Sequence, residues 1–523
     1  MAAIQMEGFS KRNAADPTCA AEWFRRRACL SPERPALTFE GQTWSYGEMQ
    51  RRIGRMSRVL KKGGIGIGDR VAYIGFNHSE VLVMFFAAAC IGAIFVPLNF
   101  RLAIPELISI IVDAKPHTLI ADEHHAPIVD RARDLLTCKR YLCLGPAIVG
   151  WEAINRTVAE EATIPAPAAT YPDDVVLLLY TSGTTGKPKG AKINNGNIWA
   201  SNVATVLANE FNSRDVALNS APLFHAAGLC SISLPTLMAG GHLILQRRFD
   251  AREYLCALEQ YRVTLSIMVP AMMLFVSQQN DFESANLSAL RLLSTGGAPV
   301  PEHLLRTYNA RGIPVSQSYG LTESTSVATI LQTDYSCAKL GSCGRASLMV
   351  DIRLVDGEGR VIAQPYVRGE ICLRGPSIAM GYWNRPLETA ELFDQEGWLR
   401  TGDGGYFDDE GFYYICDRIK DMIISGGENV YPSEVENVLC EHVAITEVAV
   451  IGGPDERWGE RVIAIAALKL GASLSLEELV AFAQDRLARY KLPRELHLVE
   501  AMPRTTTGKI IKSELRHQFA SRI

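Results

Sequence analysis

Short, continuously apolar runs alternate with helical stretches along the first half of the chain. The runs at residues 71–74, 93–97 and 119–120 are apolar throughout, which is typical of strands buried on both faces of a parallel sheet. The run at 174–180 has the same character and ends abruptly in a loop rich in glycine, threonine and lysine. The pattern recurs further along, at residues 265–269, 290–294 and 315–318. It predicts an α/β fold with parallel-type sheets flanked by helices.

A different pattern follows in the third quarter of the chain. Residues 350–355 and 369–374 are typical of antiparallel strands, and the glycines at 357 and 359 predict a tight turn after the first of them. We expect this stretch to form a β-rich subdomain of a large N-terminal domain.

The last hundred residues predict a smaller α+β domain. Strands are expected at residues 445–451 and 462–468. Ser475 and Glu478 have the spacing of a capping box, and apolar residues on one helical face follow them.

The overall composition is that of an ordinary globular protein. Of 523 residues, 48% are hydrophobic and 21% charged, with 42 glycines and 25 prolines. These values exclude a disordered, collagen-like or disulfide-framework chain. The formal net charge of -4 provides no whole-molecule basic field, so we expect no nucleic-acid partner.

Cysteine spacing and apolar run length indicate the compartment. None of the 12 cysteines forms a Cys-x-x-Cys pair, which favours reduced core thiols over a zinc or redox motif. The most apolar stretch, 81–96, is shorter than the roughly 20 residues of a membrane-spanning helix and is better explained by a buried helix leading into a buried strand. Residues 1–27 lack the apolar core of a secretory signal. We therefore expect a cytoplasmic protein without a transmembrane segment.

The most informative motif directly follows the apolar run at 174–180. Residues 181–190 contain three glycines, four hydroxyl side chains and two lysines. Glycines let the backbone approach a ligand closely, while the hydroxyls, backbone N–H groups and lysines suit a polyphosphate. The motif is not a Walker A loop, because two residues rather than four separate Gly183 from Gly186. The alternative, a solvated hairpin turn, does not account for so many such residues in a row.

This loop resembles the phosphate loop of the adenylate-forming superfamily, which includes acyl-CoA synthetases, adenylation domains of peptide synthetases and luciferases. Other motifs of the superfamily follow in order over nearly the whole chain. They are Pro222-Leu223-Phe224-His225, Tyr319-Gly320-Leu321-Thr322-Glu323, Thr401-Gly402-Asp403, Asp417-Arg418-Ile419-Lys420-Asp421, Gly426-Gly427-Glu428-Asn429-Val430-Tyr431-Pro432 and Thr507-Gly508-Lys509. The sequence of residues 417–436 is most similar to that of bacterial fatty-acyl and aromatic-acyl CoA ligases.

The resemblance implies a two-step reaction with ATP, Mg²⁺ and coenzyme A. A carboxylate first attacks the α-phosphate of ATP to give an acyl-adenylate and pyrophosphate, and a thiol then displaces AMP. Because the first step brings two anions together, cations and fixed dipoles have to neutralise the developing charge.

The resemblance also implies nucleotide-binding roles for the matched residues. Those expected to hold the β- and γ-phosphates are Thr181, Ser182, Gly183, Thr184, Thr185, Gly186, Lys187 and Lys189. Adenine would stack on Tyr319, beside the backbone of Gly296, Gly297, Ala298 and Pro299. The ribose hydroxyls would bind Asp403, and further nucleotide contacts would come from Ser318, Gly320, Ile415 and Arg418.

Four residues are expected to take part in the chemistry itself. Thr322 would touch the α-phosphate, and Lys509 would bridge it to the substrate carboxylate. Glu323 would hold Mg²⁺ together with Thr181, since this hard ion prefers oxygen ligands. His225 completes the candidate catalytic set.

The polar segment at 417–421 marks the expected domain boundary. We predict an N-terminal AMP-binding domain of residues 1–419 and a mobile C-terminal domain of residues 420–523. By resemblance, Lys420 is the hinge about which the small domain swings between the half-reactions. That motion would exchange Lys509 for a thiol-binding face, formed by Ser425, Gly426, Gly427 and Glu428.

The residues expected near the acid favour a simple monocarboxylic substrate. His225 occupies the position where peptide-synthetase domains carry an aspartate for the α-ammonium group of an amino acid. The acyl pocket implied by resemblance is lined by His225, Met272, Gly296, Ser318 and Gly320. The segment 269–273 and the small residues at 226–228 suggest an apolar slot without a basic group for a second carboxylate. A medium- to long-chain fatty acid is the first expectation, and an aromatic acid such as a cinnamate, ferulate or benzoate is the alternative.

Several alternatives remain open from the sequence alone. The chain is either a CoA ligase, a stand-alone adenylation enzyme that loads a carrier protein, or a catalytically silent nucleotide- or acyl-binding regulator. The arginine runs at 25–27 and 247–248 are either solvated faces or a peripheral contact with an anionic membrane. The chain is expected to be a monomer or a homodimer.

Overall fold

The computed structural model of the protein describes residues 16–146, 148–154, 170–181, 188–298, 300–418, 421–425, 428–455, 457–505 and 508–520. The chain divides into two compact units, and each is built from segments distant in sequence. The first unit comprises Met1–Arg248, Thr322–Ser326 and Pro376–Ala390. The second comprises Phe249–Leu321, Val327–Gly375 and Glu391–Ile523.

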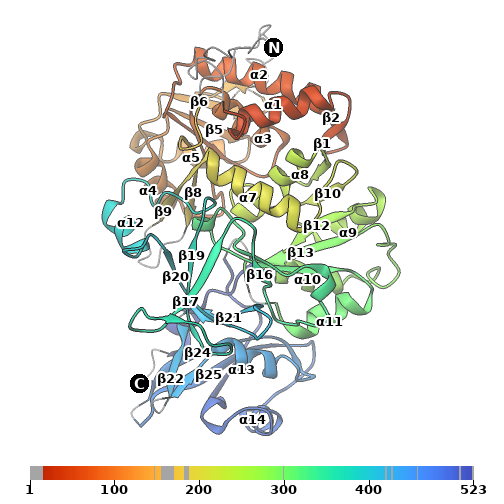
Figure 1. Ribbon diagram of the computed structural model, residues 1–523, viewed down its shortest axis with the longest axis vertical. Coiled ribbons are helices and arrows are strands. Elements are labelled where there is room, and N and C mark those ends of the chain that lie inside the picture. Colours follow the sequence, from red (N-terminus) through yellow and green to blue (C-terminus); the bar gives the residue numbers. More distant parts are fainter. Residues whose placement is uncertain are drawn as a thin grey trace, which may run out of the picture. The chain divides into compact units, whose positions relative to one another are not determined.

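A largely parallel sheet forms the centre of the first unit (Figure 1). Its strand order is β7-β6-β5-β3-β4-β8-β9, and the pair β8–β9 is antiparallel whereas the other neighbours are parallel. The strands are β3 (Arg70–Ile74), β4 (Ile94–Leu98), β5 (Thr118–Asp122), β6 (Arg140–Leu144), β7 (Glu152–Ala153), β8 (Val175–Thr181) and β9 (Lys189–Asn194). This confirms the parallel sheet predicted from the apolar runs.

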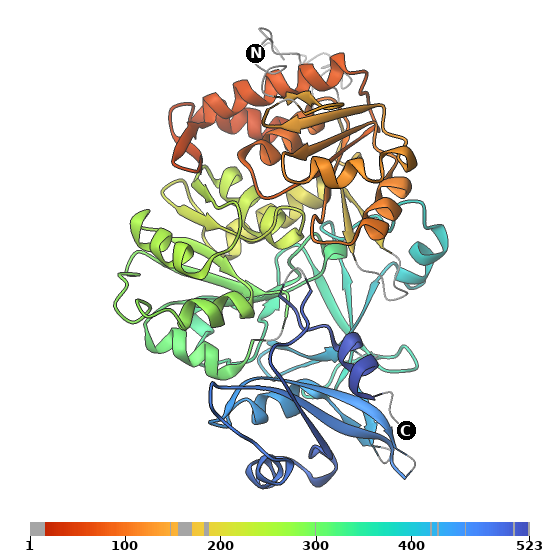
Figure 2. The same ribbon diagram turned by 180° about the vertical axis from the view of Figure 1, so that it is seen from behind.

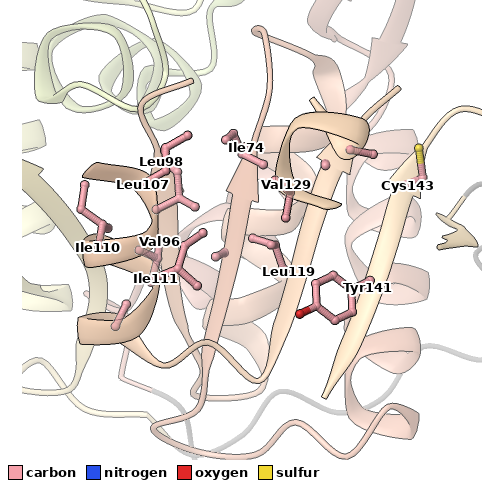
Figure 3. Packing of buried hydrophobic residues seen from close by; sticks show 14 of the residues in the cluster. Ile74, Val96, Leu98, Leu107, Ile110, Ile111, Leu119, Val129, Tyr141 and Cys143 are labelled. Atoms are coloured by element: carbon pink, nitrogen blue, oxygen red, sulfur yellow. The ribbon is translucent and has the colours of Figure 1, made fainter. Parts of the chain in front are cut away.

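Helices cover both faces of this sheet, as Figure 2 shows from behind. On one face, α4 (Ile104–Ala114) and α5 (Ala126–Asp130) pack on alternate strand residues to form a buried cluster (Figure 3). Leu119 and Val96 lie at its centre and are fully buried. On the other face lies α3 (Ser79–Cys90), all of whose residues are buried. It runs into β4, as expected for the apolar stretch at 81–96.

The first unit contains a second set of strands beside further helices. Strand β11 (His242–Leu245) lies between β10 (Val216–Asn219) and β1 (Pro35–Phe39), parallel to both, and β2 (Gln42–Ser45) is antiparallel to β1. The neighbouring helices are α1 (Ala20–Leu30), α2 (Tyr46–Lys62), α7 (Asn195–Ala208), η2 (Ala227–Ser233) and α8 (Leu234–Ala239).

The second unit begins with three neighbouring parallel strands. These are β12 (Leu265–Met268), β13 (Leu292–Gly296) and β14 (Val315–Tyr319), as the recurring apolar pattern predicted. The antiparallel strands β15 (Thr329–Ile330) and β16 (Arg345–Ala346) follow at the β14 edge. The helices of this part are α9 (Ala251–Gln260), α10 (Pro270–Ser277) and α11 (Glu302–Ala310).

An antiparallel sheet confirms the predicted β-rich region. Its order is β18-β17-β19-β20-β21. The strands are β17 (Asp351–Val355), β18 (Val361–Ile362), β19 (Gly369–Arg374), β20 (Leu399–Phe407) and β21 (Tyr413–Arg418).

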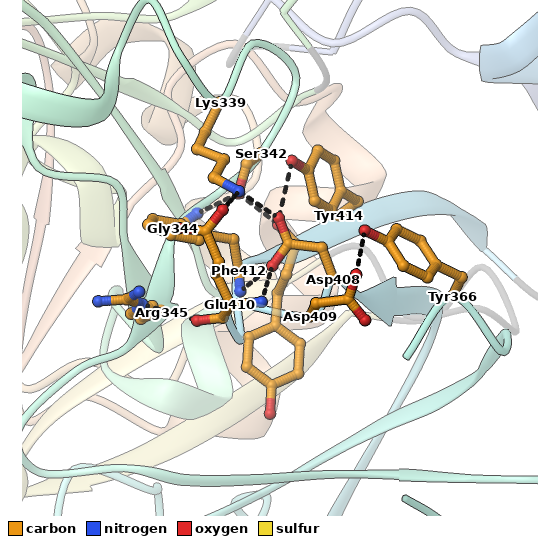
Figure 4. A network of polar contacts seen from close by, with 11 residues as sticks. Lys339, Ser342, Gly344, Arg345, Tyr366, Asp408, Asp409, Glu410, Phe412 and Tyr414 are labelled. Carbon is orange, nitrogen blue, oxygen red and sulfur yellow. Dashed lines mark hydrogen bonds and ion pairs between the residues drawn. The ribbon is translucent and has the colours of Figure 1, made fainter. Parts of the chain in front are cut away.

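A polar network fixes the turn between β20 and β21 (Figure 4). Lys339 Nζ lies 2.8 Å from Asp408 Oδ2 and 2.5 Å from Glu410 Oε1. Asp408 Oδ1 accepts the backbone N–H groups of Glu410 and Phe412. Burial would raise the pKa of Asp408, but the Lys339 ammonium and the two backbone N–H donors outweigh it and hold that pKa below its ordinary value. The network therefore sets the register of the hairpin that carries Asp403.

The C-terminal part of the second unit has the predicted α+β character. Its strands β23-β22-β25-β24, with β26 beside β25, form one sheet. They are β22 (Ile423–Ser425), β23 (Glu428–Val430), β24 (Ile445–Asp455), β25 (Gly459–Leu468) and β26 (Glu495–Val499), with helices α13 (Pro432–Leu439) and α14 (Leu476–Ala483). Ser475 and Glu478 form the expected capping box at the start of α14. Throughout the described part of the chain, no helix combines the length and the apolar character needed to cross a membrane.

Candidate active site

The two ends of the expected phosphate loop lie side by side in the first unit. Thr181 ends β8 and Lys189 begins β9, and the two residues pair across the antiparallel ladder. The hairpin therefore presents both ends of the loop at one edge of the sheet. The expected loop residues Ser182, Gly183, Thr184, Thr185, Gly186 and Lys187 lie outside the described residues.

Glu323 is a buried carboxylate in the first unit. It belongs to the short helix η3 (Thr322–Ser324), and its side chain is 8% exposed. Its Oε1 accepts a hydrogen bond from the Tyr382 hydroxyl at 2.6 Å. Among the residues that the structure describes, no cation lies within ion-pair distance of this carboxylate. A buried carboxylate is stabilised by a nearby positive charge, so this position suits a bound cation.

Sequence reasoning missed Tyr382. Its ring lies under the Lys189 ammonium, 5.3 Å from the ring centroid, within the range of a cation–π contact. The structure thus joins Lys189, Glu323 and Tyr382 in one group. The sequence signal was weak, because a glycine followed by the aromatic pair Tyr382-Trp383 is equally typical of ordinary packing.

His225 lies at the end of a row of aromatic side chains in the first unit. Its ring centroid is 4.8 Å from that of Phe224, which in turn is 5.5 Å from Phe100. Burial, and to a lesser degree the charge of Arg101, lower the pKa of His225 to about 4. The imidazole is therefore neutral near pH 7. Arg101 was not expected from the sequence, which predicted no basic group here.

In the second unit, Tyr319 and Asp403 meet directly. The Tyr319 hydroxyl donates to Asp403 Oδ2 at 2.8 Å, which links the end of β14 to β20. Burial and the neighbouring carboxylate raise the pKa of Tyr319 well above its ordinary value of 10, so it stays a neutral donor. Asp403 pairs with Arg418 across the β20–β21 ladder, and Ile415 lies on the same strand as Arg418. The Arg418 side chain lies outside the described part of the structure.

Gly296 and Gly297 form the expected backbone segment at the end of β13. A Cβ on Gly296 would lie 2.4 Å from the Ser318 carbonyl oxygen, so only glycine fits between β13 and β14. Gly297 has φ +78°, a left-handed conformation that favours glycine. Ala298 and Gly320 are partly buried beside these strands, whereas Pro299 lies outside the described residues.

Lys509 occupies a tight turn in the C-terminal part of the second unit. Thr505 N–H donates to Lys509 O at 2.7 Å, and Lys509 N–H donates to Thr505 Oγ1 at 3.1 Å. Gly508 lies against α10, because a Cβ there would be 3.2 Å from the Ala271 Cβ. The turn thus contacts Ala271, which directly precedes the predicted acyl-pocket residue Met272 in the sequence.

The predicted thiol face is only partly described. Ser425 is buried and Glu428 is exposed, and the two pair at the end of the β22–β23 hairpin. Gly426, Gly427 and the predicted hinge Lys420 lie outside the described residues. Their roles therefore stay predictions.

The donor set around Glu323 fits Mg²⁺. Within the described ranges, no cluster of three or more histidine, cysteine, aspartate or glutamate side chains could hold a metal. Mg²⁺ is commonly bound through one or two carboxylates plus substrate phosphates rather than by an all-protein cage. A single buried carboxylate, Glu323, linked through Tyr382 to one end of the expected phosphate loop, meets that requirement.

Comparison with known families now identifies the class of protein. The family model of AMP-binding enzymes matches residues 24–383, and that of the AMP-binding enzyme C-terminal domain matches residues 434–509. The chain therefore belongs to the family of AMP-binding enzymes. Its relatives also place it in the acyl-CoA synthetase branch of the adenylate-forming superfamily, as the motifs predicted: it is an AMP-forming acid–CoA ligase that uses ATP, Mg²⁺ and coenzyme A.

Three curated relatives match the chain over nearly their whole length. A feruloyl-CoA synthase of Amycolatopsis sp is 41% identical over 95% of this chain and 98% of that protein. An indoleacetate–CoA ligase of Aromatoleum aromaticum is 38% identical, covering 96% and 98%. A long-chain-fatty-acid–CoA ligase of Mycobacterium tuberculosis is 37% identical, covering 95% and 98%.

Solved structures agree with this assignment. A fatty acyl CoA synthetase of Mycobacterium tuberculosis is 36% identical with a TM-score of 0.76, covering 96% of this chain and 99% of that one. An o-succinylbenzoate CoA synthetase of Bacillus subtilis in complex with ATP and magnesium ion is 32% identical with a TM-score of 0.84, covering 94% and 99%. The predicted fold class, with a large N-terminal and a small C-terminal domain, is thereby confirmed.

Proposed function

We propose that the protein converts an aromatic monocarboxylic acid of the arylpropenoic or arylacetic type into its coenzyme A thioester. The observation that carries this proposal is the near full-length similarity to a feruloyl-CoA synthase, at 41% identity, and to an indoleacetate–CoA ligase, at 38%. Our first expectation from the sequence, a medium- to long-chain fatty acid, is not confirmed. The aromatic alternative becomes the preferred substrate class.

The side chains around His225 support an aromatic acid. Phe100, Phe224 and His225 offer ring faces and edges at centroid distances of 4.8 to 5.5 Å, which suit stacking against a planar substrate. Because its pKa is lowered, the imidazole of His225 is uncharged near pH 7 and can pack against an apolar ring. Arg101, whose pKa is lowered by burial, supplies a positive potential that favours a carboxylate nearby.

In the first half-reaction, the substrate carboxylate oxygen forms a bond to the α-phosphorus, and the bond to the pyrophosphate oxygen breaks. We propose that Thr322 and Lys509 donate to the charge that builds up on the α-phosphate and the attacking carboxylate. Glu323, with Thr181, would hold Mg²⁺, which when bound neutralises phosphate charge. Tyr319 and Asp403 would orient the adenosine, the carboxylate of Asp403 accepting the ribose hydroxyls.

In the second half-reaction, the coenzyme A sulfur forms a bond to the acyl carbon, the bond to the AMP oxygen breaks, and the thiol proton is released to solvent. We propose that residues 420–523 act as a domain that turns about Lys420 between the two steps. The turn would withdraw Lys509 and present Ser425, Gly426, Gly427 and Glu428 to the thiol. The separate match of residues 434–509 to a C-terminal domain model supports this division of the chain.

One observation favours a second candidate, a fatty acid. The long-chain-fatty-acid–CoA ligase of Mycobacterium tuberculosis is nearly as similar, at 37% identity, as the two aromatic-acid ligases. Met272 and Ala271, which are 7% and 8% exposed, provide apolar surface that an alkyl chain could also cover.

An acid panel tests the proposal. Ferulate, 4-coumarate, indole-3-acetate, phenylacetate, octanoate and palmitate are each incubated with the enzyme, ATP, Mg²⁺ and coenzyme A, and AMP and the thioester are quantified. We expect the highest kcat/KM with an aromatic acid. A higher value with octanoate or palmitate would overturn the substrate class and establish the second candidate.

The same assay separates a free thiol from a carrier protein. The acceptor of an acid–CoA ligase is coenzyme A, so thioester formation should not require any added protein. Pyrophosphate exchange without thioester would instead support a carrier-loading adenylation enzyme. A cytoplasmic location and a monomeric or homodimeric state stay predictions, as does any peripheral contact with a membrane.

A further inference from the structure

The segment 376–383 connects two parts of the candidate site in the first unit. On one side it pairs with β9, because Lys192 N–H donates to Gly381 O at 2.8 Å and Trp383 N–H donates to Gly190 O at 2.7 Å. On the other side, Ala379 N–H donates to the backbone oxygen of Glu323 at 2.8 Å. The strand that follows the phosphate loop and the turn that carries Glu323 are thus held by one stretch of backbone.

Tyr382 is the residue of this segment whose side chain reaches both parts. Its hydroxyl donates to Glu323 Oε1 at 2.6 Å, and its ring lies 5.3 Å from Lys189 Nζ. The backbone on which it sits is fixed as well. Thr389 Oγ1 accepts the Tyr382 N–H at 2.9 Å, and Tyr382 pairs with Ala191 of β9 in an antiparallel bridge. The phenol is therefore rigidly placed.

We propose that Tyr382 is a positioning residue for magnesium–nucleotide binding. By donating to Oε1, its hydroxyl holds the Glu323 carboxylate in one orientation and leaves Oε2 for the metal. A ligand that is already oriented loses less conformational freedom on binding than one that has to be ordered. The ring separately holds Lys189 by a cation–π contact, so that its ammonium is directed before the phosphates bind. This inference rests on the proposed role of Glu323 as the Mg²⁺ ligand.

Two substitutions at this position distinguish the contribution of the Tyr382 hydroxyl from that of its ring. Tyr382→Phe removes the donor to Glu323 but keeps the aromatic face beneath Lys189. Tyr382→Leu removes both. ATP binding to the full-length protein, without any acid, is measured by calorimetry over a series of Mg²⁺ concentrations.

For Tyr382→Phe we expect the Mg²⁺ concentration for half-maximal ATP binding to rise about tenfold, the size that accompanies loss of a hydrogen bond to a charged group. ATP affinity at saturating Mg²⁺ should change little, because the ring still holds Lys189. For Tyr382→Leu we expect the same rise in the Mg²⁺ requirement and, in addition, a weaker affinity at saturating Mg²⁺.

Tyr366→Phe is the matched control. The Tyr366 hydroxyl also donates to a carboxylate, Asp409 at 3.1 Å, but in the β-rich sheet region of the second unit and on an exposed side chain. This variant should retain the parent Mg²⁺ dependence. If Tyr382→Phe does not fold, Thr389→Val is used instead, because it removes the hydroxyl that anchors the Tyr382 backbone and should raise the Mg²⁺ requirement in the same direction.

Glu323→Gln distinguishes failure of this inference from failure of the proposed function. If Glu323→Gln raises the Mg²⁺ requirement whereas Tyr382→Phe leaves it unchanged or lowers it, the positioning role is wrong and the role of Glu323 stands. If Glu323→Gln itself leaves the Mg²⁺ dependence unchanged, the magnesium role of Glu323 is wrong, and the role of Tyr382 is overturned with it.

Discussion

The hydroxyl of Tyr319 and the carboxylate of Asp403 are joined by a hydrogen bond of 2.8 Å, although 84 positions separate the two residues in the chain. One of the two Asp403 carboxylate oxygens is thus engaged by a neutral donor, because the Tyr319 pKa is raised far above the physiological range. The carboxylate is held in place by the same side chain that we propose to stack on adenine.

This pair predicts a graded loss of nucleotide affinity. Asp403→Ala removes both proposed ribose contacts and should weaken ATP binding by at least about tenfold, given what hydrogen bonds to a charged group contribute. Tyr319→Phe removes only the hydroxyl that orients the carboxylate, so its effect should be smaller. Calorimetric titration with ATP measures both. Asp351→Ala, which removes an exposed carboxylate on β17, is the control, and equal affinities for it and Asp403→Ala would contradict the ribose role.

Lys509 is predicted to act in one half-reaction only. Lys509→Ala should slow adenylation by at least about 10²-fold, the effect of losing one stabiliser of transition-state charge. Thioester formation from supplied acyl-adenylate should stay close to the parent rate. Pyrophosphate exchange and single-turnover thioester assays measure the two steps separately. Equal losses in both steps would argue against the assigned role.

A substitution at the predicted hinge should have the opposite signature. Lys420→Pro fixes φ near -65° and should hinder a swing about this residue. We expect pyrophosphate exchange to be retained. Transfer to coenzyme A should fall at least about tenfold, because this step requires the swing. A variant with normal transfer to coenzyme A would remove the hinge hypothesis.

The pKa of His225 predicts how stability depends on pH. The folded-state value of about 4 lies below the ordinary 6.5, so the unfolded chain binds more protons between these two values. The contribution of neutral His225 is fully present above pH 6.5 and is lost as the pH falls towards 4, at most about 3 kcal/mol in total. His78, whose pKa burial also lowers to about 4, acts in the same window.

Urea denaturation between pH 4.5 and 7.5 tests this prediction. His225→Gln cannot titrate, so the free energy of unfolding of this variant should fall less than that of the parent as the pH is lowered. The pH dependence that remains in the variant is expected to come in part from His78. Parallel curves for parent and variant would show that His225 is not buried as a neutral ring.

The core of the first unit predicts a large, local effect on stability. Leu119 of β5 is fully buried in the cluster, and Leu119→Ala should reduce the free energy of unfolding by about 2–5 kcal/mol. Leu135→Ala removes the same atoms from a side chain that is 62% exposed and should change it by less than about 0.5 kcal/mol. Chemical denaturation compares the two. Similar effects would contradict the packing described for this sheet.

Much of the fold could be predicted from the sequence, because strands buried on both faces of a parallel sheet form continuous apolar runs. The runs that become β3 and β4, and the apolar centre of β5, are recognisable for this reason. The capping box at Ser475 was equally clear, since its two partners are only three residues apart. Motif order correctly predicted the family.

What the sequence did not reveal depends on contacts between distant segments. Tyr382 meets Glu323 only because residues 376–390 return to the first unit, and no local spacing encodes that return. Arg101 likewise comes close to His225 from 124 positions earlier in the chain. The sequence left the substrate class open for a related reason, because apolar pocket residues serve an alkyl chain and an aromatic ring alike.

The interleaved make-up of the first unit has a consequence for synthesis of the chain. Its first 248 residues leave the ribosome well before Pro376–Ala390, which completes the same unit, so roughly 140 further residues must be added first. At translation rates of about 5–20 residues per second, this delay is on the order of ten seconds. During that time the nascent chain cannot form the hydrogen bond between Tyr382 and Glu323. We expect chaperones to bind the incomplete unit until the last segment is added.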